Sequence, residues 1–316
     1  MRPGWRPAHR ATRRLPLLRV EMNLFTEPRP TLDGLSPRVR EWAESGRTEE
    51  VAAGLPVHVY TADNDSGPLV CFLHGFPSSS FDWRHTFDRL PGRLDLSILA
   101  LDFLGFGLSG KPRQENSLLL QADLVEALVA RHGVEGRPVY LVGHDMGTSV
   151  GLELLARDIE GSLGFDIAGV LLFNGSMVQS AASPILGQRL LRGRFGPVFA
   201  RLQNERFFRD QFGSVFSEAH PLTDEEATDQ WQLLNYDGGG RMGHLLISYM
   251  DERERRAERW HGALRDWEGD LRLAWGLEDR VATTNVLDAV LRLRPNAPVT
   301  RLPGIGHYPQ IEDPER

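Results

Sequence analysis

An aspartate directly after a short apolar run is the residue best placed for covalent chemistry in this 316-residue chain. Val139 to Val142 has the composition of a buried strand, and Thr148 to Arg157 has the apolar spacing of a helix. Gly143 and Gly147 flank Asp145, two residues before and two after it. This pattern is typical of the sharp strand–turn–helix bend that presents a nucleophile. A carboxylate there needs no base to activate it, and it can displace a leaving group from carbon to form an ester that water must cleave.

Two residues farther along the chain give Asp145 the partners that this chemistry needs. Asp279 and His307 follow later predicted strands, so the chain order is nucleophile, acid, histidine, as in α/β-hydrolases. Catalytic groups of open α/β sheets collect beyond the carboxyl ends of the strands, so the three can converge. His307 would take a proton from water, Asp279 would accept the Nδ1 proton of His307, and the activated water would cleave the ester. Taken singly, Asp145 could be a helix cap, Asp279 a turn residue and His307 a loop residue.

Hydrolysis of the ester places negative charge on an oxygen of Asp145, which requires preorganised donors. In this type of site the donors are the backbone N–H groups of the residue after the nucleophile and of a loop after an earlier strand. These correspond to Met146 and Phe76. We expect His74 to brace the Phe76 loop by hydrogen bonding, and Pro77 to stiffen it, with a cis peptide bond as one option.

The elements that must position these residues alternate between apolar strands and helices. A helix at Ser36–Glu44 and antiparallel strands at Glu49–Ala53 and Val57–Tyr60 precede them. Helices are predicted at Ser117–His132 and Thr284–Leu293. Buried strands are predicted at Leu69–Leu73 and Ile167–Asn174, and further strands at Leu94–Leu101, Arg272–Trp275 and Val299–Leu302. The alternation predicts an α/β fold with a mostly parallel, twisted sheet flanked by helices.

The pattern changes between residues 175 and 267, where no run resembles a central strand. Helical spacing dominates, so we interpret this segment as an inserted helical cap. The core then comprises 36–174 and 268–316, and 1–35 is a disordered region or an extension. The charged run 250–260 is expected to be a solvated helix face. Helices are predicted within the cap at Pro184–Arg192, Val198–Phe208, Asp224–Leu234 and Gly243–Leu264.

Composition excludes several classes of function. A net charge of −7 and a pI near 5.8 give no general attraction to nucleic acid. Cys71 is the only cysteine, so no disulfide can form within the chain. No run of 18 apolar residues predicts a membrane span, and Leu15 to Leu18 is too short for a signal-peptide core. We therefore expect a cytoplasmic protein with no metal or cofactor, whose partners are a small apolar substrate and water.

Residues 36 to 316 resemble the α/β-hydrolase superfamily, in the branch of epoxide hydrolases and haloalkane dehalogenases. The resemblance implies an α/β-hydrolase fold and a cofactor-independent hydrolase with an aspartate nucleophile. The motifs occur in the family's order and each follows a predicted strand: His74-Gly-Phe-Pro77, Asp102-Phe-Leu-Gly-Phe-Gly-Leu-Ser109, Gly143-His-Asp-Met-Gly147, Gly276-Leu-Glu-Asp279 and Gly306-His-Tyr-Pro-Gln310.

The leaving group separates the two activities of that branch. The resemblance implies that a dehalogenase would hold the halide with side-chain N–H donors, but Met146 and Phe76 have none. It also implies a cap tyrosine as the acid for an epoxide. Tyr249 is the candidate, although a core aromatic fits equally well, and Tyr236 is the weaker choice. The early cap, residues 177–216, contains no tyrosine, which departs from the usual pair.

An epoxide hydrolase acting on apolar epoxides is therefore the favoured function. Trp231, together with Phe76 and Met146, is expected to make the pocket apolar, although Trp231 could instead be an ordinary core aromatic. The alternatives are a haloalkane dehalogenase, an esterase-like hydrolase, or a hydrolase-fold protein that binds a ligand without turnover.

Overall fold

The computed structural model describes residues 30–51, 55–63, 67–90, 95–133 and 136–316. Most of the extension predicted for residues 1–35, and Ala53 at the end of a predicted strand, lie outside the described residues. Helix α1 (Pro37–Ser45) begins as predicted: Ser36 is its N-cap, and the Ser36 hydroxyl accepts the Val39 N–H at 3.2 Å.

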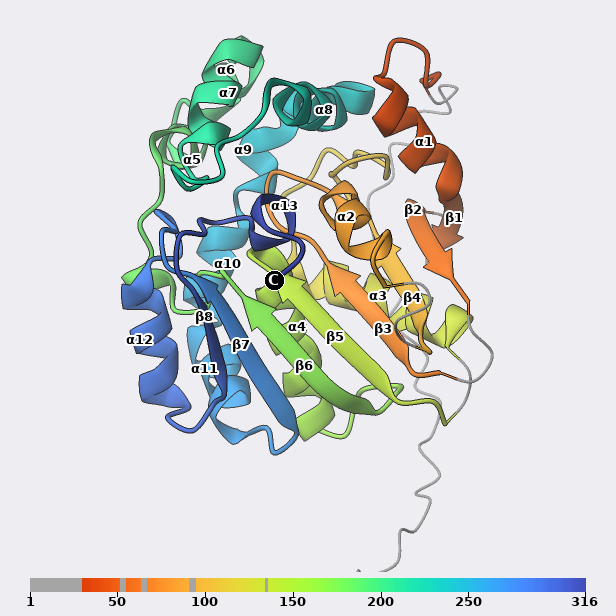
Figure 1. Ribbon diagram of the computed structural model, residues 1–316, viewed down its shortest axis with the longest axis vertical. Coiled ribbons are helices and arrows are strands. Elements are labelled where there is room, and N and C mark those ends of the chain that lie inside the picture. Colours follow the sequence, from red (N-terminus) through yellow and green to blue (C-terminus); the bar gives the residue numbers. More distant parts are fainter. Residues whose placement is uncertain (1–29, 52–54, 64–66, 91–94, 134–135) are drawn as a thin grey trace, which may run out of the picture.

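One sheet of eight strands forms the core, and its mostly parallel arrangement confirms the predicted α/β-hydrolase fold (Figure 1). Among the described strands, only the β1–β2 and β2–β4 pairs are antiparallel. The strands, in spatial order, are β1 (Arg47–Val51), β2 (Leu55–Ala62), β4 (Ser97–Leu101), β3 (Leu69–Leu73), β5 (Val139–His144), β6 (Ile167–Phe173), β7 (Asp270–Gly276) and β8 (Val299–Leu302). Because β3, β5, β6 and β7 are parallel neighbours, the residues that follow them meet at one edge of the sheet.

Helices of the core pack against this sheet. Helix α4 (Met146–Ile159) lies on β5 and β6, with α3 (Leu118–His132) on one side and α11 (Ala257–Asp266) on the other. Eleven of its 14 residues are buried, so the helix is held tightly in the core, and its first residue fixes where the bend before it lies. The remaining core helices are η2 (Ser80–Trp83), α2 (Arg84–Phe87), α12 (Thr284–Leu293) and α13 (Pro309–Glu312).

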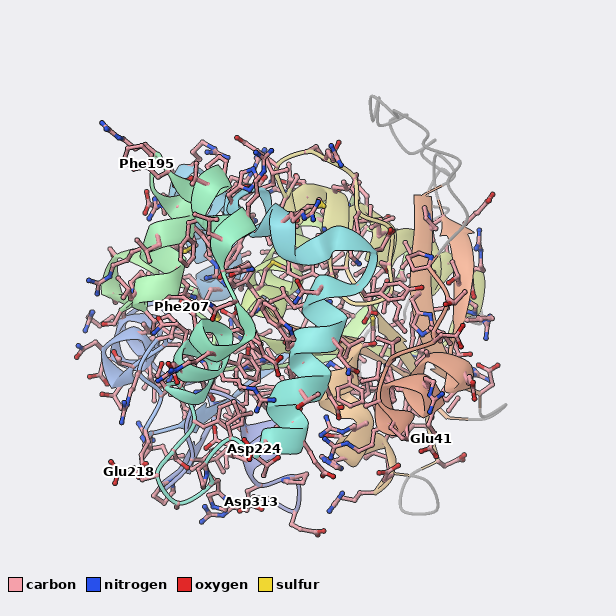
Figure 2. All side chains as sticks on the ribbon, turned by 90° about the horizontal axis from the view of Figure 1, so that it is seen from above. Glu41, Phe195, Phe207, Glu218, Asp224 and Asp313 are labelled. Carbon is pink, nitrogen blue, oxygen red and sulfur yellow. The ribbon has the colours of Figure 1, made fainter. Side chains whose placement is uncertain are left out.

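The segment between β6 and β7 is helical. Figure 1 shows α5 to α8 beyond one end of the sheet, and Figure 2, from above, shows α8 with Asp224 at its start crossing this face. None of the described helices has the length and apolarity that a bilayer crossing requires. The segment comprises η3 (Gln179–Ala181), α5 (Leu186–Arg192), α6 (Gly196–Leu202), α7 (Glu205–Gly213), α8 (Asp224–Asn235), η4 (Tyr236–Met242), α9 (Gly243–Leu246), α10 (Tyr249–Arg255) and α11.

Three sequence predictions for this segment are wrong. The helix predicted at Val198–Phe208 is broken, because the Asn204 side chain accepts the Phe207 N–H and starts a new helix. The helix predicted at Gly243–Leu264 is divided into α9, α10 and α11, with Arg256 at φ −110° between the last two. The charged run 250–260 is not simply a solvated face, because Glu252 and Arg253 are buried.

A buried polar cluster joins the helical segment to the core. Asp82 of η2 is fully buried; its Oδ1 accepts the Gln230 amide of α8 at 2.8 Å, and its Oδ2 accepts the Ser78 hydroxyl. Beside it, Glu226 of α8 forms an ion pair with Arg84. Burial raises the pKa of Asp82 to about 7.

Asp82→Asn should stabilise the protein progressively as the pH rises from about 4 to 7. The folded-state pKa of Asp82, about 7, exceeds the reference value of 3.8, so folding favours the protonated carboxyl, and wild-type stability falls across this range. Asparagine retains the acceptor oxygen for Gln230 and cannot ionise. Thermal unfolding at pH 4.5 and pH 8 should show a gain of several degrees in Tm at the higher pH only. An equal gain or loss at both pH values would contradict the assignment.

Candidate active site

The bend after β5 presents Asp145 with a positive φ of 42°. Asp145 occupies the N-cap position of α4, but its side chain makes no capping hydrogen bond, so the simple capping interpretation is wrong. Small neighbours make the bend possible: a Cβ on Gly147 would lie 2.2 Å from the Leu73 carbonyl oxygen, and one on Gly75 would lie 2.7 Å from the Asp145 Cβ.

One of the two expected oxyanion donors is engaged in the resting structure. The Phe76 N–H donates to Asp145 Oδ2 at 2.9 Å, and the Phe76–Pro77 peptide bond is cis. The buried His74 ring joins its loop to the next strand end: Nε2 accepts the Phe103 N–H at 2.9 Å, so Nδ1 donates to the Gly75 carbonyl at 2.7 Å. This leaves His74 no free ring nitrogen, as expected of a bracing residue.

The acid and the histidine meet as an aligned pair. His307 Nδ1 donates to Asp279 Oδ2 at 2.7 Å, and both side chains are almost fully buried. The Val281 and Ala282 N–H groups donate to the other Asp279 oxygen at 2.7 and 3.0 Å. Because Asp279 is held from both sides, the tautomer of His307 is fixed, and Nε2 is the nitrogen left to take a proton.

Two buried residues that support this pair escaped the sequence analysis. Asn174, at φ 45° after β6, donates to Asp279 Oδ2 at 2.8 Å. The Gln310 amide donates to His144 Nδ1 at 3.2 Å, so His144 Nε2 donates to the His307 carbonyl at 2.7 Å. The available signal was position: Asn174 follows a strand at the catalytic edge, and His144 immediately precedes Asp145.

A buried arginine beside the nucleophile is the largest departure from expectation. Arg253 Nη2 lies 3.5 Å from Asp145 Oδ1 and donates to the Asp145 carbonyl at 3.0 Å, while its Nε donates to Ser149 at 2.7 Å. Its guanidinium stands 4.6 Å from the ring centre of Tyr249, and that ring lies 5.6 Å from the ring of Phe76. Tyr249, only 1% exposed, therefore lies in the same buried cluster as Asp145.

Charge in this cluster is balanced between the carboxylate and its cationic neighbours. Burial opposes ionisation of Asp145, but Arg253 and His307 outweigh it, and the net pKa of Asp145 lies below the usual value. Burial disfavours the charged imidazole of His307, yet Asp279 and Asp145 outweigh it and raise its pKa. Burial, with the Asp145 charge, also raises the pKa of Tyr249, so the phenol keeps its proton in the resting site.

Arg253→Met should raise the pKa of Asp145 and move the acidic limb of kcat/KM to higher pH, because the cation that favours the carboxylate is lost. Breaking a buried ion pair typically costs about 3–5 kcal/mol, so Tm should fall as well. Arg253→Lys should restore part of the pH profile. Arg255→Met, on the exposed face of the same helix, is the control. A profile unchanged in Arg253→Met would show that Arg253 does not set the charge of Asp145.

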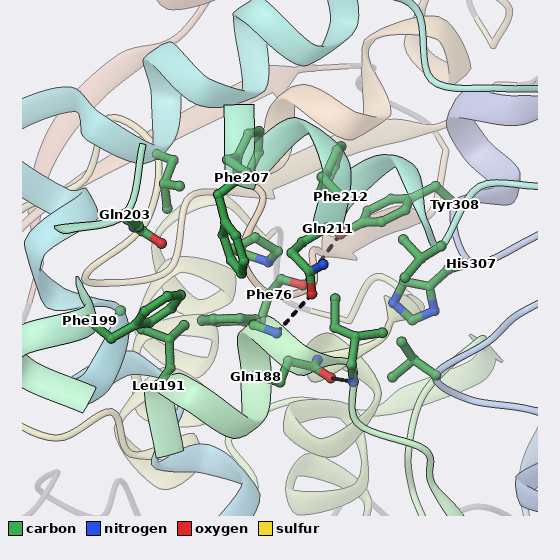
Figure 3. Close-up of a pocket in the computed structure, with 18 residues that line it drawn as sticks. Phe76, Gln188, Leu191, Phe199, Gln203, Phe207, Gln211, Phe212, His307 and Tyr308 are labelled. Atoms are coloured by element: carbon green, nitrogen blue, oxygen red, sulfur yellow. Dashed lines mark hydrogen bonds between the residues drawn. The ribbon is translucent and has the colours of Figure 1, made fainter. Parts of the chain in front are cut away.

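A pocket of about 670 Å³, including its mouth, opens onto His307 and Phe76 (Figure 3). Asp145 and Tyr249 are not among its lining residues; Phe76, which contacts both, forms the boundary on their side. Most of the remaining lining is apolar and comes from the helical segment, chiefly Leu191, Phe199, Phe207, Phe208, Phe212 and Leu234.

Polar groups in the pocket are few and held in fixed orientations. The amide oxygen of Gln188 accepts the Ile185 N–H at 3.0 Å, and the amide oxygen of Gln211 accepts the Gly187 N–H at 2.9 Å. Both side-chain oxygens are therefore turned toward the backbone. Their NH₂ groups therefore remain as donors. Within the described part of the chain, no three His, Cys, Asp or Glu side chains are grouped so that they could hold a metal ion.

Three residues expected to line the pocket lie elsewhere. The Tyr236 hydroxyl donates to the Pro30 carbonyl at 2.9 Å, and the Trp231 ring packs on Phe208 from outside the lining. The side chain of Met146 is fully buried, and its sulfur lies 3.2 Å from the Asn116 amide. Their aromatic or apolar character predicts burial, but only Met146 is buried, whereas Trp231 and Tyr236 are half-buried outside the pocket.

Comparisons with known proteins agree with the fold of this chain. The sequence profile described as the alpha/beta hydrolase family matches residues 72–316. The protein LipZ from Mycobacterium tuberculosis is 53% identical over 281 residues, covering 89% of this chain and 95% of LipZ. The mesoderm-specific transcript protein of Mus musculus is 32% identical over 290 residues, covering 89% and 85%. The crystal structure of the haloalkane dehalogenase DatA from Agrobacterium tumefaciens superimposes with a TM-score of 0.68 at 25% identity, covering 86% and 93%.

Proposed function

The chain belongs to the alpha/beta hydrolase family, and on that premise we propose that it hydrolyses apolar epoxides through an ester on Asp145. The observation that carries the proposal is the carboxylate at the bend, held by the Phe76 N–H, in the same site as the His307–Asp279 pair. A serine hydrolase needs a base to activate its nucleophile, whereas here the nucleophile is already ionised and the histidine is available for water.

In the first step Asp145 attacks an epoxide carbon, and the carbon–oxygen bond of the ring breaks. The opening oxygen takes the proton of Tyr249. This proton transfer becomes easier as the ester forms. Besides burial, the negative charge of Asp145 raises the pKa of Tyr249, and ester formation removes that charge. Arg253, no longer paired with a carboxylate, then stabilises the phenolate across the 4.6 Å contact with the ring.

In the second step His307 Nε2 takes a proton from water, and the hydroxide adds to the ester carbonyl. The Phe76 N–H supports the oxyanion, and Met146 offers the second backbone donor. Collapse of this tetrahedral adduct breaks the bond between the Asp145 carbonyl carbon and the product oxygen. That oxygen leaves as an alkoxide and receives the proton held by His307. The second proton of the water returns to Tyr249, so the products are a diol and the starting enzyme.

The surroundings favour an epoxide over a halide as the leaving group. Neither Phe76 nor Met146 has a side-chain N–H donor, and Tyr249 supplies a protonated hydroxyl near Asp145. The pocket accommodates an apolar body, and the Gln188 and Gln211 amides could donate to one oxygen on it. Turnover of haloalkanes remains the second candidate, because the dehalogenase DatA shares the fold of this chain.

Tyr249→Phe should slow epoxide opening by roughly 10²–10⁴-fold, because the alkoxide loses its acid. Styrene oxide, a bromoalkane and a p-nitrophenyl ester assayed side by side, with single-turnover kinetics on the epoxide, would measure this. Tyr236→Phe removes a hydroxyl that is bonded to Pro30 outside the pocket, so it should keep the wild-type rate. Haloalkane turnover without epoxide turnover would rule out epoxides as the substrate class. Full activity in Tyr249→Phe would rule out Tyr249 as the proton donor.

A further inference from the structure

The outer face of helices α5 and α6 carries an exposed apolar patch. Seven large hydrophobic residues among those described are strongly exposed, and five of them lie in this one segment. The most exposed are Phe195 at 63% and Leu202 at 73%, and Figure 2 shows Phe195 projecting from the edge of the molecule. The five, which we call the α5–α6 patch, are Leu186, Leu190, Phe195, Val198 and Leu202.

Arginines are interspersed with this patch, and no acidic residue occurs between positions 184 and 204. Arg192 is neutralised by ion pairs with Asp251 and Glu254 of α10. The other three arginines, Arg189, Arg194 and Arg201, are exposed and form no ion pair with the described residues. A local positive charge therefore surrounds the patch, although the whole chain carries a net charge of −7.

The same two helices line the pocket with different residues. Gln188, Leu191 and Phe199 face inward to the pocket, whereas the patch residues on either side of them in sequence face outward. With the patch against a bilayer, apolar molecules dissolved in that bilayer would lie next to the helices that form the pocket. An exposed apolar face flanked by arginines is the composition of helices that lie in the interface of anionic membranes.

We propose that the α5–α6 patch docks onto the surface of an anionic lipid bilayer, where the pocket receives its apolar substrate. Phe195 and the leucines enter the boundary between headgroups and acyl chains, and Arg189, Arg194 and Arg201 contact lipid phosphates. Charge complementarity favours this occupant over a second copy of the chain, because two copies would oppose the same arginines. The delivery of substrate rests on the proposed function; the docking does not.

Flotation with vesicles of phosphatidylcholine and phosphatidylglycerol tests the docking without any substrate. We expect wild type to bind vesicles that contain the anionic lipid at least about tenfold more strongly than vesicles of phosphatidylcholine alone. A triple variant, Leu190→Ser with Phe195→Ser and Leu202→Ser, should lose about tenfold or more of this binding, and so should Arg189→Gln with Arg194→Gln and Arg201→Gln. Tyr140→Ser with Ile159→Ser removes the two exposed large hydrophobic residues that lie outside the patch in the described part of the chain, and this variant should bind like wild type.

Asp145→Asn, which cannot turn over substrate by the proposed mechanism, should bind vesicles normally, so failure of docking and failure of catalysis are distinguishable. Equal binding to neutral and anionic vesicles, or absence of vesicle binding, would overturn the proposal. Concentration-dependent dimerisation that the serine triple variant abolishes would assign the patch to a second copy instead. If docking delivers substrate, the serine triple variant should turn over a long-chain epoxide in vesicles more slowly and water-dissolved styrene oxide at the wild-type rate.

Discussion

Asp145→Asn should lower turnover of any substrate by roughly 10⁴-fold or more, because an amide oxygen at this bend is a poor nucleophile and no other group can form the ester. The Phe76 N–H can still donate to the asparagine oxygen, but the buried Arg253 loses its carboxylate partner, so Tm should fall as in Arg253→Met, and activity must be measured at a temperature where the variant is folded. Asp237→Asn is a matched control, since Asp237 also has a positive φ but lies exposed in the helical segment.

Residual activity in Asp145→Asn must be checked against the intact mass, because deamidation would regenerate aspartate. Activity near the wild-type level in protein whose mass confirms asparagine would exclude the covalent mechanism. It would favour direct attack of water on the substrate, for which His307 and Asp279 alone would suffice.

His307→Gln should separate the two halves of the reaction. Alkylation of Asp145 needs no base and should proceed, whereas hydrolysis loses its base and should slow by roughly 10³-fold or more. The ester should therefore accumulate to one equivalent per chain, visible as a mass increase on the peptide that contains Asp145. His220→Gln, in the helical segment, should accumulate none. Slow product release without any covalent adduct in His307→Gln would be inconsistent with this role.

The meeting of Asp145, Asp279 and His307 at one edge of the sheet was predictable because it depends on local patterns. The bend around Asp145 requires small residues at close backbone approaches, and those glycines are visible in the sequence. Strands were predicted before each of the three candidate residues, and in the structure β5, β7 and β8 end at the same edge of the sheet. The 2.7 Å contact between His307 and Asp279 follows from that edge, although they are 28 residues apart.

The helical segment was less predictable because its burial depends on contacts between distant residues. Arg253 lies in a run of charged residues whose composition suggests a solvated face, and its burial depends on contacts with Asp145 and Ser149, 108 and 104 residues earlier. Tyr236 contacts Pro30 across 206 residues, which no local pattern reveals. The break at Asn204 was visible in principle, since asparagine is a preferred N-cap.

Isotope incorporation from H₂¹⁸O tests the central claim, ester formation on Asp145, most directly. In the proposed mechanism water attacks the carbonyl carbon of the ester, so one carboxylate oxygen of Asp145 is replaced by solvent oxygen in each cycle. After several turnovers in H₂¹⁸O, mass spectrometry of the peptide that contains Asp145 should show heavy oxygen in its carboxylate, and a first turnover with limiting substrate should give mostly unlabelled product. Heavy oxygen in the product of that first turnover, with none in Asp145, would contradict the account.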